Sequence, residues 1–324
     1  MCKISAVLLL ISQLVLITYT QQGQMLKQNI LAITNVTVID ATGAVAKPGM
    51  TVIIKNELID SIGKTGKIKI PGNAQTIDAT GKFLIPGLWD MHIHSGGYEN
   101  GKKYFPVLVA NGITGVRDMG TSLEEILHLR KEVSEGKTIA PRIFIAGPIL
   151  QGPLPFQNPV FISVNDEREA REAVINLKKN GVDFIKVQDA VTRDLYYAIV
   201  DEAKRQNLPV VGHIPPFITA REASNARQRS VEHLGGRFYG VLLGCSTRED
   251  ELRQKILKII DDFLKAFKEN KEPDNSAIFR VAFTKPLLES LSEKKEKTLL
   301  ARFCRMLPVF SEIEIVNSIT INLI

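Results

Sequence analysis

Hydrophobic and polar positions change their period several times along the chain, and each change marks a different kind of element. Residues 4–17 are almost continuously apolar. Residues 30–80 carry many β-branched side chains that roughly alternate with polar ones, in short stretches separated by Gly, Asn and Pro, and this pattern predicts a small sheet domain. From Phe83 onward strand-like and helix-like stretches alternate, and residues 249–305 are helical and charged.

The alternating part predicts βαβ units and therefore an α/β fold built on a parallel sheet. The expected strands are 83–94, 113–118, 142–147, 183–188, 209–214 and 230–234, and the expected helices lie near 101–111, 122–135, 166–180, 192–206 and 219–227. Six strands over so short a stretch suit a barrel or a doubly wound sheet. The chain has neither a G-x-G-x-x-G fingerprint after a strand nor a G-K-[ST] phosphate loop, which favours the barrel over a nucleotide-binding fold.

The N-terminus has the pattern of a cleaved secretory signal, which we expect over residues 1–20. Lys3 supplies a positive charge, the apolar run 4–17 follows, and residues 18–22 turn polar. The run is shorter than the roughly 20 residues that span a bilayer, and we find no later segment that would span one. A buried core helix would suit the length of the run but not its position. We therefore expect a secreted or periplasmic protein.

The last part of the chain departs from the alternating pattern. Residues 249–305 predict a helical insertion, and its first helix has one apolar face made of Leu252, Ile256, Ile259, Ile260, Phe263, Leu264 and Phe267. For this face we favour packing against the barrel over binding of a partner. Residues 306–324 contain no seventh or eighth strand–helix unit, so we expect an atypical C-terminal end there.

Composition narrows the function classes. Apolar residues make up 44% and charged residues 23% of the 324, which allows a sizeable core and excludes wholesale disorder. The net charge is +6, but even the most charged stretch, 248–305, mixes 14 basic with 11 acidic side chains. A nucleic-acid surface would be one-sided, so we expect no nucleic-acid partner. Three cysteines are too few for a disulfide framework or a thiolate metal site, and no feature specifies an oligomeric state.

Four of the five histidines stand at the carboxyl ends of expected strands. His92 and His94 are two residues apart on one strand, so both point to the same face. His213 and His233 close two later strands. Because the carboxyl ends of barrel strands form the active-site mouth, these four imidazoles predict a metal site. His128 lies on an expected helix, and we interpret it as a solvated surface residue without a partner.

Lys186 is a further candidate, because it lies within an expected buried strand. A desolvated ammonium is unfavourable, so the lysine pairs with an acid, extends out of the strand end, or is chemically converted. A lysine that carries CO2 becomes a carbamate, an anionic oxygen donor that is able to bridge two divalent cations. Arg117, Asp118 and Tyr239 are weaker candidates for the pocket, and structural roles suit them equally well.

Several stretches resemble the amidohydrolase superfamily of metal-dependent hydrolases, in its imidazolonepropionase-like or prolidase-like branch. Residues 85–94 (IPGLWDMHIH) resemble the first barrel strand, and 77–84 (IDATGKFL) its lead-in from a β-sandwich domain. Four further stretches are similar to later strands of the family. Residues 112–120 (GITGVRDMG) resemble the second strand, 184–187 (FIKV) the strand of the carboxylated lysine, and 211–215 (VGHIP) and 230–235 (SVEHLG) the fifth and sixth strands. The resemblance covers roughly 30–245, and the helical stretch that follows is similar to an insertion of that branch.

This resemblance implies a binuclear metal centre. His92 and His94 would bind the buried metal, His213 and His233 the more exposed one, and carboxylated Lys186 would bridge both. A hydroxide held by the metals would attack a carbon–nitrogen bond in an amide, a cyclic amide or an Xaa-Pro dipeptide. Two zinc ions suit imidazole and carboxylate ligands, although manganese, iron or cobalt are also compatible with them. The expected partner is therefore a small molecule or a dipeptide.

The resemblance also implies a departure from the family's pattern. The family ends its eighth strand with an aspartate that shuttles a proton, and we find no counterpart in this chain. We therefore expect an incomplete (β/α)8 barrel of about six units over residues 83–248, preceded by a β-sandwich part over 21–82. The alternative to an active hydrolase is a truncated and catalytically impaired chain that binds at most a metal or a ligand.

Overall fold

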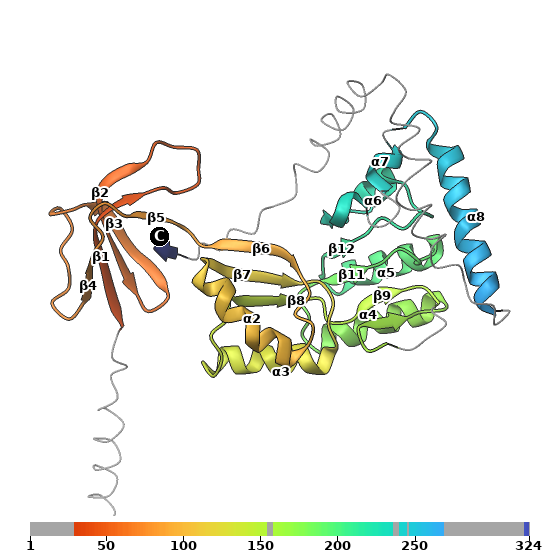
Figure 1. The fold of residues 1–324 in the computed structure, drawn as a ribbon, viewed down its shortest axis with the longest axis horizontal. Coiled ribbons are helices and arrows are strands. Elements are labelled where there is room, and N and C mark those ends of the chain that lie inside the picture. Colours follow the sequence, from red (N-terminus) through yellow and green to blue (C-terminus); the bar gives the residue numbers. More distant parts are fainter. Residues whose placement is uncertain (1–28, 154–157, 236–239, 245, 269–320, 324) are drawn as a thin grey trace, which may run out of the picture. The chain divides into compact units, whose positions relative to one another are not determined.

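The computed structural model describes residues 29–153, 158–235, 240–244, 246–268 and 321–323, in two compact units (Figure 1). Unit 1 runs to Pro86 and includes Ile321–Leu323, and unit 2 begins at Gly87. The expected signal segment lies outside the described residues. The same holds for residues 269–305 of the expected insertion and for most of the expected C-terminal end.

Unit 1 is a mixed sheet in the order β14-β5-β1-β2-β3, and β4 also pairs with β1. Its strands are β1 (Ile30–Val38), β2 (Lys47–Lys55), β3 (Leu58–Lys64), β4 (Gln75–Asp78), β5 (Phe83–Pro86) and β14 (Ile321–Leu323). β1 is buried on both faces, because Ile33 and Val36 pack in one apolar cluster with Val52 while Ala32 packs in another with Ile53. The burial of both faces agrees with the unbroken apolar run Ile30–Ile33 at the start of β1.

Unit 2 is an α/β structure in which every strand pairing is parallel. Its strands are β6 (Leu88–Ile93), β7 (Ile113–Asp118), β8 (Arg142–Ile145), β9 (Ile149–Gln151), β10 (Phe161–Ser163), β11 (Ile185–Val187), β12 (Val210–Gly212) and β13 (Ser230–Val231). The helices are α2 (Tyr98–Ala110), α3 (Leu123–Ser134), α4 (Glu167–Lys179), α5 (Arg193–Arg205), α6 (Ala220–Asn225), α7 (Gly240–Gly244) and α8 (Glu249–Lys268), with a 3-10 turn at Glu232–Leu234.

Two parallel sheets, β6-β7-β8 and β10-β9-β11-β12-β13, follow one another in unit 2. The N–H of Asp183 donates to the carbonyl of Ile145 over 2.9 Å, and the Asp183 carboxylate accepts from the N–H of Ile145 over 2.8 Å. These two bonds connect the end of β8 to the segment that enters β11. The main strands therefore succeed each other in chain order, as consecutive right-handed βαβ units do.

Alternation along the strands separates a helix-covered face from an inner face. Ile185 and Val187 pack in the large cluster with the helices, whereas Phe184 packs in a smaller cluster with Val211 and with Phe144 of β8. Because side chains alternate along a strand, Lys186 shares the face of Phe184 rather than that of its two neighbours. The same rule assigns His213 to the face of Val211. Lys186 and His213 thus lie on the inner face.

The observed elements agree with most of the expected ones, and the differences have local causes. The expected strand 83–94 is divided at Gly87, which follows Pro86, so that β5 belongs to unit 1 and β6 to unit 2. β9, β10 and α7 were not expected, because the Gly and Pro residues within or beside them are typical of turns and loops.

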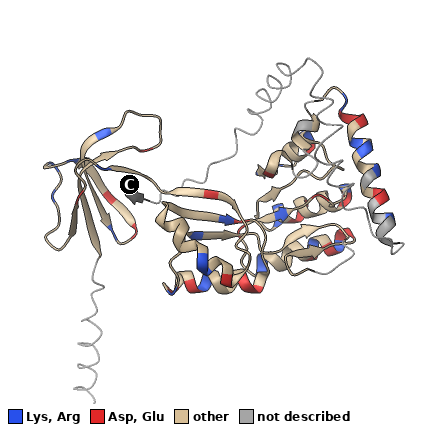
Figure 2. Cartoon of the chain, in the orientation of Figure 1, with Lys and Arg blue, Asp and Glu red and all other residues tan. Residues whose placement is uncertain are grey.

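Helix α8 is attached to the loop that follows β12. Leu252 is buried, and the guanidinium of Arg253 donates to the carbonyls of Pro216 and Ile218 at 2.6 and 2.9 Å. Charges of both signs alternate along the described part of α8, so its exposed side carries no one-sided patch (Figure 2). No helix in the described ranges is long and apolar enough to cross a membrane.

Replacement of Gly212, the last residue of β12, should destabilise unit 2. Gly212 has φ +124°, and a Cβ there would lie 2.3 Å from the carbonyl oxygen of Val187. Gly136 also has positive φ but open space around it, so Gly136→Ala measures the backbone strain alone, about 1–2 kcal/mol. We expect Gly212→Ala to lose about 3 kcal/mol or more of unfolding free energy. Denaturant unfolding followed by the fluorescence of Trp89 in β6 measures both, and equal losses would contradict this account.

Candidate functional site

The five candidate residues all lie at the carboxyl ends of the parallel strands of unit 2. His92 is in β6, and His94 follows that strand. Lys186 is the middle residue of β11, and His213 comes directly after β12. His233 lies in the 3-10 turn after β13. Since parallel strands end at the same edge, the fold brings all five to one end of the sheets.

Imidazole rings from three different strand ends lie next to one another. The ring centroids of His92 and His94 are 5.4 Å apart, those of His92 and His233 4.4 Å, and those of His213 and His233 5.5 Å. The described parts of β6 and β13 share no hydrogen-bonded pairing, so the curvature of the sheets brings these ends together. The four rings form one contiguous group.

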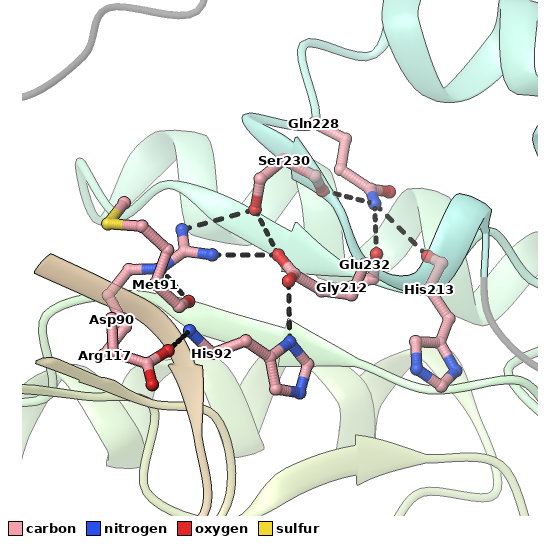
Figure 3. Close-up of polar contacts among 9 residues, drawn as sticks. All are labelled: Asp90, Met91, His92, Arg117, Gly212, His213, Gln228, Ser230 and Glu232. Carbon is pink, nitrogen blue, oxygen red and sulfur yellow. Dashed lines mark hydrogen bonds and ion pairs between the residues drawn. The ribbon is translucent and has the colours of Figure 1, made fainter.

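The two histidines of the first strand end are held through the same ring nitrogen. Nδ1 of His92 lies 2.7 Å from Oε2 of Glu232, and Nδ1 of His94 lies 2.9 Å from the carbonyl oxygen of Gly120. Figure 3 shows the His92 ring and the Glu232 carboxylate facing one another. When Nδ1 donates to an acceptor, Nε2 carries the free lone pair, and this is the usual arrangement of a metal-binding histidine.

His213 lies close to the carboxylate of Asp189, but the two side chains do not form a hydrogen bond. Its Nδ1 lies 2.9 Å from Oδ1 of Asp189, yet both atoms are buried without a hydrogen-bond partner. Buried polar atoms are nearly always hydrogen-bonded, so such a pair marks a place where a further polar or charged group would be stabilised. Asp189 follows β11 by two residues and was not anticipated as a site residue.

Glu232 joins three strands through its carboxylate. Oε1 accepts from Nη2 of Arg117 at 2.9 Å and from Oγ of Ser230 at 2.6 Å, while Oε2 meets His92 (Figure 3). Burial opposes its ionisation, but the hydrogen bonds from His92 and Ser230 and the charge of Arg117 outweigh this effect and lower the pKa of Glu232 to about 2. Glu232 is therefore an anion at neutral pH.

Lys186 is buried on the inner face, 1% exposed, and no carboxylate of the described residues lies within ion-pair distance of its ammonium. Burial lowers the pKa of Lys186 to about 8, against the more distant attraction of Glu232 and Asp189. Burial thus favours the uncharged amine, which is the nucleophilic form, more than in a solvated lysine. Of the alternatives that the sequence left open, a close acid partner is not present in the described structure.

His233 has an unusual backbone for a residue with a side chain. Its φ and ψ are 52° and 39°, in the left-handed region, and Leu234 follows with φ 57°. Histidine tolerates this region better than most residues, but strain of this kind is typical of functional sites. Partial burial and the nearby His92, His213 and Lys186 lower the pKa of His233. A neutral imidazole is the form that binds metals.

A buried amide fixes the backbone of the last two strand ends. Nε2 of Gln228 donates to the carbonyls of Gly212, His213 and Ser230 at 3.0–3.2 Å (Figure 3). Its oxygen accepts from the hydroxyl of Tyr196 in α5 at 2.9 Å. Gln228 therefore ties the His213 segment to β13 and to a covering helix.

The weaker candidates have structural positions. Arg117 belongs to the Glu232 group, as described above. Asp118 is fully buried and shapes the turn after β7, where its carboxylate accepts from the N–H groups of Ser95 and Gly120 and from the hydroxyl of Thr121. Tyr239 lies outside the described residues.

The interpretation of His128 as a residue without a partner is wrong. Its ring is stacked on that of Tyr98 with centroids 4.3 Å apart and planes 2° from parallel, and Nε2 lies 3.9 Å from Glu132. The side chain is nevertheless 57% exposed, on α3, in keeping with a surface position. Tyr98 contacts the ring from α2, and Glu132 contacts it from the next turn of α3. The sequence of one helix could not predict the contact with Tyr98, because Tyr98 belongs to another helix.

The clustered histidines and Asp189 are residue types that bind divalent cations, although their side chains are not arranged around a common point. Among the described residues, no group of three or more His, Cys, Asp or Glu side chains stands ready to hold a metal ion. The fit rests instead on the Nδ1 contacts of His92 and His94, which leave Nε2 free, and on the unsatisfied atoms of His213 and Asp189.

Glu232 and Asp189 are the site residues that sequence reasoning missed. Glu232 was visible next to His233, and its position two residues after Ser230 predicts that the two share a strand face. The contacts of Glu232 with His92 of β6 and Arg117 of β7 could not be predicted from this position alone, because they depend on how the strands are arranged in space. Asp189 offers a weaker signal, three residues after Lys186 in a loop.

Part of the chain is similar to known proteins. Residues 83–237 match the model of the amidohydrolase family. A dihydroorotase from Trichlorobacter lovleyi is 33% identical over 115 residues, which cover 32% of this chain and 26% of the relative. A structure from Bifidobacterium longum, provisionally assigned as a prolidase, is 25% identical with a TM-score of 0.52, covering 61% of this chain and 52% of its own.

A prolidase solved with N-methylphosphonate-L-proline covers 85% of this chain and 76% of its own with a TM-score of 0.56, and at 20% identity this likeness concerns the fold. The chain thus spans about a quarter of the dihydroorotase and about half of the Bifidobacterium structure. The match over 83–237 contains all four clustered histidines, Lys186 and the parallel α/β architecture that positions them. Over this segment, which is slightly less than half of the chain, the sequence is similar to the amidohydrolase family.

Proposed function

We propose that unit 2 carries a binuclear metal centre that hydrolyses a carbon–nitrogen bond. The observation that carries this proposal is the contiguous group of four imidazoles at the carboxyl ends of β6, β12 and β13, with Lys186 on the same inner face. Imidazoles at this end of parallel strands are suited to bind divalent cations and to leave a position open for substrate.

The candidate residues would bind two cations. His92 and His94 would hold one cation, His213 and His233 the other, and carboxylated Lys186 would bridge both. Bound divalent cations would lower the pKa of a bound water and polarise the scissile carbonyl. Zinc suits this combination of imidazole and carbamate oxygen, and manganese, iron or cobalt are the other candidates.

Carboxylation of Lys186 is supported by its surroundings. The uncharged Nζ attacks the carbon of CO2, a C–N bond forms and one proton leaves, so that the side chain changes from a cation or neutral amine to an anion. Burial without a close acid partner disfavours the ammonium at this place. Neighbouring cations would stabilise the anionic product.

The substrate class follows from the family and from the relatives. The family match and the likeness to a dihydroorotase and to a prolidase-type structure support an amide, a cyclic amide or an Xaa-Pro dipeptide. The alternative is a chain that keeps the fold and binds a metal or ligand with impaired turnover. The measurements below separate these two.

We also propose a wider architecture and a location. The curved succession of six main strands supports a partial (β/α)8 barrel, and the mixed sheet of unit 1 supports part of a β-sandwich domain. The charge and hydropathy order of residues 1–20 supports a cleaved signal and export to the periplasm or the outside of the cell.

Removal of one histidine should remove one cation. After reconstitution with zinc, the unchanged chain should hold two zinc ions and His92→Ala at most one, measured by plasma mass spectrometry. Turnover on a panel of Xaa-Pro dipeptides and cyclic amides should fall by more than about 100-fold, because loss of an outer partner alone typically costs 10- to 100-fold. His128→Ala, on the surface of α3, should keep both zinc and turnover.

Unchanged zinc content in His92→Ala would count against the ligand assignment. Two zinc ions in the unchanged chain without turnover on any substrate of the panel would favour the impaired alternative.

Replacement of the buried lysine should separate metal binding from folding. Lys186→Met should hold at most one zinc ion, yet the metal-free variant should be as stable as the unchanged chain or more so, because a buried ammonium without a close acid partner is unfavourable. Bicarbonate should raise the zinc content of the unchanged apo-protein but not of this variant. Lys178→Met, an exposed change on α4, is the control and should respond to bicarbonate normally. A bicarbonate response in Lys186→Met would rule out the carbamate.

A further inference from the structure

One buried carboxylate collects donors from three separate strands at the inner edge of the site. Oε1 of Glu232 accepts from Arg117 in β7 and from Ser230 in β13, and Oε2 lies 2.7 Å from Nδ1 of His92 in β6 (Figure 3). The side chain of Glu232 is only 9% exposed, and that of Arg117 14%. Few solvent molecules can compete for these contacts.

Arg117 is itself fixed, which makes the arrangement rigid. Its Nε donates to the carbonyl of Met91 at 2.8 Å, one residue before His92, and its guanidinium lies 5.6 Å from the ring centroid of Phe184. The donor that orients Glu232 is therefore bound to the same strand as the histidine that Glu232 contacts. The strand β6, the guanidinium and the carboxylate form a closed loop of contacts.

This arrangement dictates the tautomer of His92. Arg117 can only donate, and it donates both to Oε1 of Glu232 and to the hydroxyl of Ser230, whose own proton then points to Oε1. Oε2 is the oxygen that faces the imidazole, and a carboxylate oxygen only accepts hydrogen bonds. Nδ1 of His92 must then carry the proton, and Nε2 must carry the lone pair. A histidine in this tautomer is ready to bind a metal through Nε2, and hydrogen bonding to an anion makes it a stronger donor.

The other histidines of the site lack this partner. His94 meets the neutral carbonyl of Gly120. His213 stands beside Asp189 without hydrogen-bond geometry. The only described contacts of the His233 ring are with other imidazoles. His92 is therefore the one among the four, within the described structure, that forms a hydrogen bond with an acid.

We propose that Glu232 is a positioning residue that fixes His92 as the Nδ1–H tautomer and thereby sets the affinity of the cation that His92 holds. The metal part of this inference rests on the proposed function. The tautomer part does not, because it concerns the metal-free chain. A merely structural Glu232 would connect β6, β7 and β13 without controlling which ring nitrogen is protonated.

The isosteric variant Glu232→Gln gives an unusually sharp test. Arg117 can only donate, so the amide oxygen must take the place of Oε1 and the NH2 group must face His92. That NH2 is a donor, and Nδ1 of His92 must then accept and leave the proton on Nε2. The variant should therefore reverse the tautomer while it keeps the shape of the side chain, and so block the nitrogen that binds the metal.

The tautomer is measured on the apo-protein by long-range 1H–15N correlation of the imidazole nitrogens, with His92 assigned by its absence in His92→Gln. We expect Nδ1–H in the unchanged chain, Nε2–H in Glu232→Gln and a mixture in Glu232→Ala. Glu202→Gln is the matched control, since Glu202 is also buried but lies on α5 away from the histidines, and it should leave Nδ1–H unchanged. An Nε2–H tautomer in the unchanged chain, or Nδ1–H in Glu232→Gln, would overturn the proposal.

Zinc affinity by chelator competition tests the second part. Glu232→Gln should weaken the binding of one zinc equivalent by 10- to 100-fold and leave the other unchanged. Equal affinities in Glu232→Gln and in the unchanged chain would refute the positioning role. If the unchanged chain binds no zinc, the proposed function fails and the tautomer result alone decides this inference. If Glu232→Gln does not fold, the tautomer of the unchanged chain still decides it.

Discussion

The ion pair between Glu232 and Arg117, extended to His92, is the interaction on which the site of unit 2 depends. β6 and β13 share no backbone pairing in the described structure, yet their ends meet through this carboxylate. A buried charge is tolerated only when donors surround it, and here the donors come from three strands. Satisfying one buried anion therefore fixes the distance between strand ends that are 140 residues apart in the chain.

Other buried polar groups of the site lack a hydrogen-bond partner within the described residues, in contrast to Glu232. Lys186 is buried without a close acid, and His213 and Asp189 face each other without a hydrogen bond. His233 is held in a left-handed backbone conformation. Proteins rarely accumulate such features where only packing is at stake, so they are expected where a ligand completes the structure. The fold supplies the rigid surroundings, through Gln228 and the Glu232 group, that keep these residues together.

Much of this arrangement could be predicted from the sequence because strands and helices alternate with clear periods. Parallel strands end at one edge, so histidines at those ends had to meet, and alternation along β11 was enough to assign Lys186 to the inner face. The contacts across that face could not be predicted in the same way. Glu232 acquires its role only from Arg117 and His92, which belong to strands on the opposite side. β9 and β10 were not predicted either, because the Gly and Pro residues around them are typical of a loop.

The central claim is that imidazoles from separate strand ends hold a shared pair of cations. X-ray absorption spectroscopy of the zinc-reconstituted chain tests it most directly. The account predicts nitrogen and oxygen ligands at about 2.0–2.1 Å, with an imidazole scattering pattern. It also predicts a second zinc at about 3.5–4 Å. A spectrum with sulfur ligands, with a hydrated ion lacking imidazole, or with a single isolated zinc would contradict it.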